Sequence, residues 1–359
     1  MSQRLMAAMI AGPLVLVLLA LAAFLPLDYV TYRPGYTVDV LAEADGAEII
    51  QVDGHKTYRD DGELRMTTVL VSLPKDDDGH CGSGCRKNLY DLMDAWVDHD
   101  DAVYPYDAIY DEQETQASND RDGAVAMVTS QDAAIAVAMR ELGLKFTPAV
   151  DVTFVEQGMP AEGKLLPRDL LLEVNGEKLV KAQQLYDAVQ ATPKGGSIDL
   201  RVRRDRTELD VTVEPRTVKG EKLIGITPGN GYAFPFDVRV NIDPDIGGPS
   251  AGLMFSLAIY DTLTPGSLTG GKTVAGTGEI APDGKVGPIG GIPQKIAGAR
   301  EDGAQLFLVP TDNCKEALGA DPGDDMRLVR ATTMHEALGA IQDWVADPDA
   351  DLPSCKDAA

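Results

Sequence analysis

A serine between small residues is the first candidate for chemistry in this sequence. Ser250 lies in the run Gly-Pro-Ser-Ala-Gly at residues 248–252, and an apolar stretch at residues 253–260 follows it. Pro249 suits a first helical turn, because the N-H that proline lacks has no partner there. We therefore expect Ser250 at the N-terminus of a buried helix, where free backbone N-H groups can stabilise an oxyanion. The serine could also be a simple helix cap, but flanking glycines that admit a substrate backbone favour catalysis.

A serine hydroxyl needs a neighbouring base to become a strong nucleophile. Lys295 lies in a second glycine-rich stretch, residues 288–299, which predicts a short helix. Its spacing from Ile292 and Ala299 places it on the side of that helix that we expect to be buried. Low-dielectric surroundings disfavour the ammonium form, so a buried Lys295 can act as a general base. Alone, a helical lysine is usually a solvated surface residue, and only the combination with Ser250 suggests catalysis.

The same serine also fits a different hydrolase. Residues 248–252 spell the Gly-x-Ser-x-Gly elbow of α/β-hydrolases, and Asp312 and His335 follow in the chain order of that fold. An elbow comes after a strand, whereas Asp-Pro-Asp at residues 243–245 indicates a turn. A Ser-His-Asp hydrolase is therefore the alternative function. A zinc protease is disfavoured, because His335 begins its motif but no second histidine completes it.

Residues 266–273, Gly-Ser-Leu-Thr-Gly-Gly-Lys-Thr, match the spelling of a phosphate-binding loop. Such a loop requires a strand before it and a helix after it. Here the expected order is reversed, because the Ser250 helix precedes the loop and a strand at residues 274–275 follows. We expect no ATP binding and predict no cofactor.

The middle of the chain predicts a small β-rich unit. Alternating residues indicate strands at 150–155 and 170–174, and then at 198–202 and 209–213, with a helix at residues 182–189 between the two pairs. A helix at residues 130–142 precedes this unit, with Ser130 as its expected N-cap and Gly143 as its stop.

The order of these elements resembles a bacterial PDZ domain. The resemblance rests on Gly-Met-Pro-Ala at residues 158–161, Leu-Pro-Arg-Asp-Leu-Leu at 166–171 and Val-Asn-Gly at 174–176. PDZ domains bind extended C-terminal peptides by adding a strand to a sheet edge. Residues 142–146 are similar to the loop that holds the peptide carboxylate, although they also fit a helix end followed by a strand.

Three motifs in the last third resemble the proteolytic domain of the Lon family of serine proteases. They are residues 248–252, Thr-Gly-Glu-Ile at 277–280, and Gly-Pro-Ile-Gly-Gly at 287–291 followed by Lys295. The resemblance covers about residues 217–345. It implies that Ser250 is the nucleophile, that Lys295 is the base and that Thr277 helps to orient the lysine.

Two departures from the Lon pattern are visible. Many Lon proteases have an acidic residue three positions before the serine, where this chain has Gly247. The ATP-driven members also carry a nucleotide-binding module, for which this chain has no room between its other units. A membrane segment and a PDZ-like unit ahead of a Lon-like domain resemble the Lon-like PDZ peptidases of Gram-positive bacteria. This resemblance implies ATP-independent proteolysis and assembly as a homo-oligomeric ring.

The N-terminus predicts a membrane anchor. No charged residue occurs at 5–27, and at about 1.5 Å per residue this length crosses a hydrocarbon core of about 30 Å. Arg4 precedes the segment, so the positive-inside rule places everything after Asp28 on the extracytoplasmic side. A cleaved signal peptide is the alternative, because Ala-Leu-Ala at residues 20–22 has the form of a cleavage site.

Charge and cysteines fit an exported protein. The formal net charge of -25 would repel phosphates, so nucleic acid is not an expected partner. Four cysteines in an exported chain predict two disulfides, and proximity favours Cys81 with Cys85 and Cys314 with Cys355. A metal site at His80, Cys81 and Cys85 is the weaker interpretation, because no second ligand pair is present.

The predicted fold is a multidomain α+β protein. We expect a transmembrane anchor at 1–28, an acidic α/β extracytoplasmic region at 29–144, a PDZ-like β-sandwich or barrel at 145–216, a Lon-type α+β proteolytic domain at 217–345 and a tail at 346–359. The predicted function is a Ser-Lys serine endopeptidase at the cell membrane that degrades or processes exported polypeptides, held by their C-termini. A non-catalytic PDZ scaffold is a further alternative.

Overall fold

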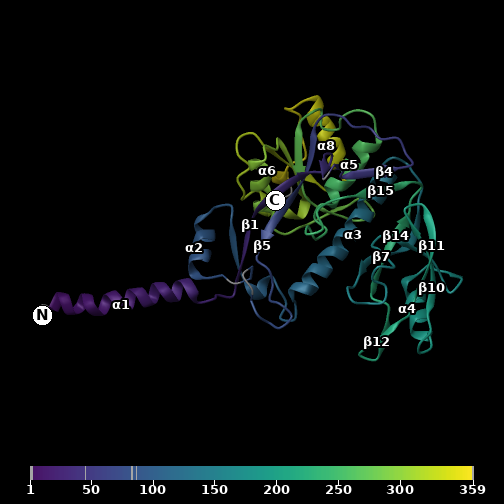
Figure 1. Ribbon diagram of the computed structural model, residues 1–359. Helices are drawn as coiled ribbons and strands as arrows, with labels where there is room; N and C mark the ends of the chain where they lie inside the picture. The colour runs from purple at the N-terminus through teal and green to yellow at the C-terminus, as the bar shows by residue number, and fades with distance from the viewer. Residues whose placement is uncertain (1–2, 45, 82–83, 86, 358–359) are drawn as a thin grey trace.

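The computed structural model of this chain describes residues 3–44, 46–81, 84–85 and 87–357 (Figure 1). Helix α1 (Gln3–Phe24) projects away from a body formed by the rest of the chain. The ends of two predicted segments, residues 1–2 of the anchor and 358–359 of the tail, lie outside the described residues.

The prediction of an N-terminal transmembrane helix is wrong. Helix α1 occupies most of the segment that we expected to cross the bilayer. Among the residues that the structure describes, however, no helix combines the length and the apolar character that a crossing requires. The predicted single-pass location, with an extracytoplasmic body, is therefore not supported either.

The main sheet has six strands in the order β20-β19-β16-β5-β1-β6. Its parallel part consists of β20 (Arg327–Ala331), β19 (Leu306–Pro310), β16 (Thr273–Gly276) and β5 (Glu63–Val71), to which β1 (Tyr29–Asp39) and β6 (Ala102–Pro105) add antiparallel strands. All five residues of β19 are buried, as expected for a strand covered on both faces. Strands β1, β5 and β6, from the stretch at 29–144 that the sequence assigned to a region of its own, thus share one sheet with β16, β19 and β20.

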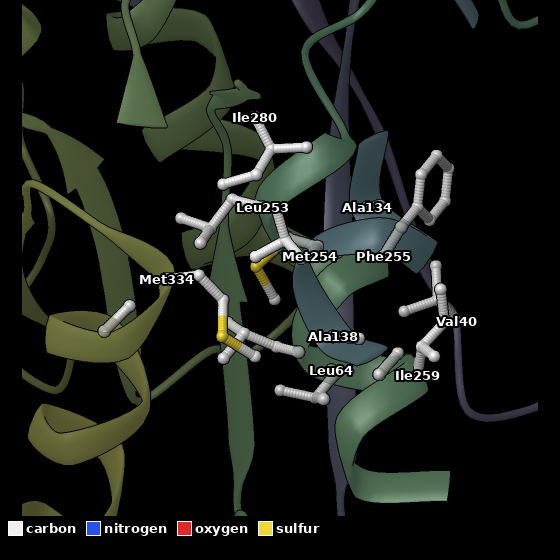
Figure 2. Packing of buried hydrophobic residues seen from close by; sticks show 14 of the residues in the cluster. Val40, Leu64, Ala134, Ala138, Leu253, Met254, Phe255, Ile259, Ile280 and Met334 are labelled. Carbon is white, nitrogen blue, oxygen red and sulfur yellow. The ribbon is translucent and has the colours of Figure 1, made fainter. Parts of the chain in front are cut away.

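Helices cover both faces of this sheet. Figure 2 shows α5 (Gly252–Leu263) packed with Ala134 and Ala138 of α3 (Gln116–Glu141) and with Met334 of α8 (Met334–Ala346). Every residue of α5 except Tyr260 is buried, which confirms the buried helix expected after Ser250. On the opposite face, α6 (Ile292–Glu301) packs with alternate residues of the same strands, such as Ala275 and Phe307.

A second sheet has the order β11-β10-β8-β7-β14, with β9 beside β8. Its strands are β7 (Thr147–Val155), β8 (Leu170–Val174), β9 (Glu177–Lys178), β10 (Ile198–Arg204), β11 (Thr207–Val213) and β14 (Ile226–Ala233), and α4 (Ala182–Ala191) belongs to the same unit. The strands and helix predicted between residues 150 and 213 are confirmed. Strand β14 comes from the segment that the sequence assigned to the proteolytic domain. The domain boundaries themselves stay predictions.

The remaining elements are short. They are β2 (Glu43–Ala44), β3 (Ala47–Glu48), β4 (Ile50–Asp53), α2 (Leu89–Val97), η1 (Tyr106–Ala108), β12 (Arg216–Val218), β13 (Glu221–Leu223), β15 (Asp237–Val240), β17 (Glu279–Ile280), β18 (Val286–Gly287), η2 (Thr311–Asn313), α7 (Cys314–Ala317) and η3 (Cys355–Asp357). Strand β15 pairs with β4 and leads into the loop that carries Ser250.

Candidate active site

Ser250 lies at the end of a loop, two residues before the first residue of α5. Its carbonyl oxygen accepts hydrogen bonds from Gly278 N (2.8 Å) and Thr277 Oγ1 (3.0 Å), both just beyond the carboxyl end of β16. The Ser250 and Ala251 N-H groups donate to no protein group in the described part of the chain. These contacts fix the serine backbone and leave two N-H groups available for an oxyanion.

Lys295 reaches the serine from the other face of the main sheet. Helix α6 begins after Gly291, whose φ of 71° is easily adopted only by a residue without a Cβ. The lysine is its fourth residue and is 2% exposed. Its Nζ lies 2.7 Å from Ser250 Oγ and 3.1 Å from Thr277 Oγ1. Two helices from opposite faces thus bring an amine and a hydroxyl together at the carboxyl edge of the sheet, where ligands bind in many α/β proteins.

Burial of Lys295 lowers its pKa to about 7, because a low-dielectric environment disfavours the ammonium form. At neutral pH a substantial part of the molecules therefore holds a neutral amine beside the hydroxyl. Such an amine can accept the serine proton, which an ammonium group cannot do.

Thr277 connects the two groups and is fully buried. Its hydroxyl donates to the Ser250 carbonyl, so its lone pairs face the Lys295 amine that donates to it. A hydroxyl with its only proton engaged elsewhere holds the amine in one orientation.

A pocket of about 180 Å³ opens beside the serine and the lysine. Its apolar lining consists of Met66, Val69 and Leu70 of β5, Met127 of α3, and Ile246 of the loop before Ser250. The charged side chains at the pocket are Asp245 and the buried Lys295. Tyr36, Thr67 and Thr68 add polar groups to the same lining.

The structure does not assemble the alternative triad. The ring of His335 is bonded through Nδ1 to Glu141 Oε1 at 2.7 Å, and its side chain is 81% exposed. Asp312 lies on the exposed surface at η2. The residues between the end of β15 at Val240 and Ser250 form turns and loop, so no strand leads into the serine as an elbow requires.

The phosphate-loop spelling at residues 266–273 lies between α5 and β16. A helix therefore precedes it and a strand follows, the reverse of the order that phosphate binding uses. Lys272, the lysine of this motif, places Nζ 4.2 Å from the centre of the Trp344 ring.

The four cysteines form two disulfides, Cys81–Cys85 and Cys314–Cys355. Asn313, which directly precedes Cys314, makes two hydrogen bonds of 2.9 Å to the backbone of Ile289. Ile289 lies in the loop that leads into α6. Among the described residues, no cluster of three or more His, Cys, Asp or Glu side chains could hold a metal.

The strand that follows the candidate carboxylate loop at residues 142–146 has a neighbour from the chain itself on both sides. Strand β7 follows the loop at residues 142–146, and it pairs with β8 on one side and with β14 on the other. The pairing with β14 is antiparallel and runs from Ile226 opposite Val155 to Ala233 opposite Thr147. A peptide could add to β7 only after β14 had left it.

Sequence reasoning missed the part of α3 that reaches the site. We expected a helix that starts at Ser130, but α3 starts at Gln116 and buries Ser130 in its middle. There the Ser130 hydroxyl donates to the Pro249 carbonyl at 2.9 Å. A serine inside a helix gives no local signal for such a contact, because its partner lies 119 positions away in the chain.

Comparison with known proteins finds a similarity over the segment that contains Ser250, Thr277 and Lys295. Residues 243–341 match the Lon protease (S16) C-terminal proteolytic domain. Lon protease 2 of Bacillus subtilis (strain 168) is 32% identical over 122 residues, which are 33% of this chain and 20% of that protein. Lon protease of Haemophilus influenzae is 35% identical over 180 residues, which are 49% of this chain and 20% of that protein.

The chain spans about a fifth of the length of these relatives. Ser250, Thr277 and Lys295 all lie within the Lon-type segment, whereas Ser130 lies outside it. Among solved structures, the PDZ domain of the SdrC-like protein of Listeria innocua is 23% identical and covers 22% of this chain and 92% of its own, with a TM-score of 0.21. The PDZ domain of the SdrC-like protein of Listeria monocytogenes has the same identity and TM-score and covers 86% of its own chain.

Proposed function

We propose that this chain is an ATP-independent serine endopeptidase in which Ser250 is the nucleophile and Lys295 is the general base. The observation that carries this proposal is the 2.7 Å separation between Lys295 Nζ and Ser250 Oγ, with the amine 2% exposed. Burial and proximity together supply what a serine nucleophile needs, namely a base that is neutral near physiological pH.

The reaction begins when the neutral Lys295 amine takes the Ser250 hydroxyl proton. The serine oxygen bonds to the peptide carbonyl carbon, and the π electrons move onto the carbonyl oxygen. The Ser250 and Ala251 N-H groups stabilise this oxyanion. When the tetrahedral intermediate collapses, the C-N bond breaks and the leaving amine takes the proton from the Lys295 ammonium. Water then repeats the sequence on the acyl-enzyme and releases the acid product.

The substrates in this proposal are polypeptides. The pocket beside Ser250, which is lined in part by apolar side chains and in part by polar ones, offers a place for the side chain next to the cleaved bond. Capture of a substrate C-terminus by the PDZ-like unit is also part of the proposal. For this capture, either β14 must separate from β7 or the peptide must pair with another edge of the sheet.

The test uses the full chain and a set of fluorogenic peptides, with and without ATP. We expect Ser250→Ala and Lys295→Arg each to abolish cleavage, because arginine stays protonated and cannot be the base. His335→Ala should retain activity and serves as the control. If Lys295→Arg cleaves normally and His335→Ala does not, the Ser-His-Asp hydrolase replaces this proposal. If no Ser250-dependent cleavage is found with any peptide, the peptidase proposal fails.

A further inference from the structure

Helix α3 contacts the loop of the nucleophile at two points. Gly248 N donates to the Gly123 carbonyl at 2.9 Å, and Ser130 Oγ donates to the Pro249 carbonyl at 2.9 Å. Gly123 and Ser130 are seven residues apart, which is two turns of one helix face. The loop that ends in Ser250 therefore lies along α3 and is bonded to it at both ends of the contact.

The fit between helix and loop is close. A Cβ on Gly247 would lie 3.3 Å from the Gly123 Cα atom, and one on Gly252 would lie 2.7 Å from Ser130 Oγ. A Cβ on Gly123 itself would lie 3.6 Å from the Gly247 Cα atom, which is an ordinary van der Waals contact, so the close approach constrains Gly247 more than Gly123. Gly247, at the position where many Lon proteases are acidic, is here a point of backbone contact with α3.

The Ser130 hydrogen bond acts on the peptide plane that ends in Ser250. The Pro249 carbonyl and the Ser250 N-H belong to one planar, trans peptide unit and point in opposite directions. A hydroxyl that holds the carbonyl therefore also sets the direction of the N-H. On the other side of the serine, Gly278 and Thr277 hold the Ser250 carbonyl and so set the direction of the Ala251 N-H.

Both peptide planes around the nucleophile are thus fixed from outside the loop, one of them by Ser130. A serine within a helix commonly bonds the carbonyl four residues back in its own helix. Thr129 shows this pattern, because its Oγ1 donates to Val125 O at 2.9 Å. Ser130 instead reaches across to the loop and is 3% exposed.

The contact is not needed to satisfy the Pro249 carbonyl, which also accepts Gly252 N at 3.3 Å. Removal of the Ser130 hydroxyl leaves this carbonyl with a partner, so the expected loss of stability is small. What is lost is the second constraint on the direction of the Ser250 N-H. A change in rate rather than in folding is therefore the expected consequence.

We propose that Ser130 is a positioning residue for the peptidase reaction, which acts through the Pro249 carbonyl to aim the Ser250 N-H at the developing oxyanion. The inference rests on the function proposed above. It assigns a role in catalysis to helix α3, which lies outside the segment that matches the Lon proteolytic domain.

The experiment compares Ser130→Ala, Ser130→Thr and Thr129→Ala in the full chain. Thr129→Ala is the matched control, because it removes a hydroxyl from the neighbouring, exposed position of the same helix. For each variant, kcat and KM are measured from pH 5 to 9 on a cleaved peptide. The folded fraction is measured by circular dichroism under the assay conditions, and rates are expressed per folded molecule.

We expect Ser130→Ala to lower kcat about tenfold or more, because loss of a direct oxyanion donor costs about a hundredfold or more and an indirect effect is smaller. KM and the apparent pKa of the pH profile should stay unchanged, since Lys295 is untouched. Ser130→Thr should regain most of the rate and Thr129→Ala should match the wild type.

The inference is overturned if Ser130→Ala has the same kcat per folded molecule as Thr129→Ala, or if Ser130→Thr is as slow as Ser130→Ala. The wild type and Ser250→Ala are measured first in the same assay. If the wild type shows no Ser250-dependent cleavage, the proposed function has failed. If it does and Ser130→Ala is as fast, only the role of Ser130 has failed.

Discussion

The amine of Lys295 on helix α6 lies 2.7 Å from the hydroxyl of Ser250, which lies two residues before the start of helix α5 on the opposite face of the same sheet. The contact is made beyond the carboxyl end of β16, where Thr277 touches both residues. Burial alone lowers the pKa of the amine to about 7. A group that titrates in this range makes the reaction sensitive to pH and the fold sensitive to the lysine charge.

The rate of peptide cleavage should rise with pH through a midpoint of about 7. Only the neutral amine can take the serine proton, and the fraction of neutral Lys295 increases as pH rises through its pKa. The measurement is kcat/KM between pH 5 and 9, with the folded fraction checked at each pH. A flat profile, or one that falls with pH in this range, would argue against a lysine base.

Replacement of Lys295 by methionine should stabilise the protein while it abolishes cleavage. The pKa of Lys295 is lower in the folded protein than its ordinary value of 10.5, so the unfolded chain binds the proton more tightly. The ammonium therefore destabilises the fold fully below pH 7, and stability rises with pH between about 7 and 10.5. A shift of this size corresponds to at most about 5 kcal/mol, from which the lost hydrogen bonds to Ser250 and Thr277 must be subtracted.

Urea unfolding at pH 6 tests this expectation, with Ser250→Ala as the comparison that removes the hydroxyl and keeps the amine. Lys295→Met should have the higher free energy of unfolding, by about 1 to 3 kcal/mol after that subtraction. A Lys295→Met variant less stable than Ser250→Ala would show that the amine is well solvated or well paired in the folded state.

Thr277→Val should slow cleavage without unfolding the protein. Valine has nearly the shape of threonine but lacks the hydroxyl that donates to the Ser250 carbonyl and accepts from Lys295. We expect kcat to fall about ten- to a hundredfold, because the amine and the serine backbone each lose one constraint. Thr277→Ser, which keeps the hydroxyl, should remain within a few-fold of the wild type. Equal rates for the valine and serine variants would contradict an orienting role.

The two residues of the proposed dyad could be selected from the sequence because each lies in a short motif whose chemistry is local. Ser250 stands between glycines at a helix start, and Lys295 follows a glycine-rich turn on an apolar helix face. Ser130 could not be predicted in the same way. Its role depends on a contact with Pro249 across the tertiary structure, and a serine within a helix has the same sequence appearance whether or not such a contact exists.

The elements of the fold also differ in whether a local sequence pattern predicts them. Alternation of apolar residues predicted the strands of the second unit, because each buries one face within the unit itself. The pairing of β5 with β16 joins residues about 210 positions apart, and no local pattern specifies it. Helix α3 was predicted too short, since its first turns are mostly exposed and polar. They are stabilised by a capping box between Thr115 and Ser118 and by the hydrogen bond from Gly248 N to the Gly123 carbonyl.

A buried carboxyl pair joins the second unit to α3. Asp151 on β7 is 1% exposed, and neither of its oxygens has a hydrogen-bond partner among the described protein groups. The neighbouring carboxyl is that of Asp132 on α3. Arg168 bonds Asp132 at 3.0 Å. Desolvation, and secondly the charge of Asp132, raise the pKa of Asp151 to about 8. Gly229 and Gly231 of β14 leave room for the Asp151 side chain, because a Cβ atom on either glycine would lie within 2.7 Å of it.

This pair should make stability fall as pH rises. Because the pKa of Asp151 is higher in the folded protein than the ordinary 3.8, its contribution is fully present below about pH 4 and is lost as pH rises to about 8. Asp151→Asn keeps the shape of the side chain and cannot ionise, so it should flatten the dependence of stability on pH. At pH 8 the variant should be more stable than the wild type. The difference between their free energies of unfolding should grow by up to about 4 kcal/mol from pH 5 to pH 8. Urea unfolding at pH 5, 6.5 and 8 measures both slopes, and Asp210→Asn on an exposed strand of the same sheet is the control. Parallel slopes for Asp151→Asn and the wild type would mean that Asp151 is ionised in the folded protein, held by Arg168 rather than by a shared proton.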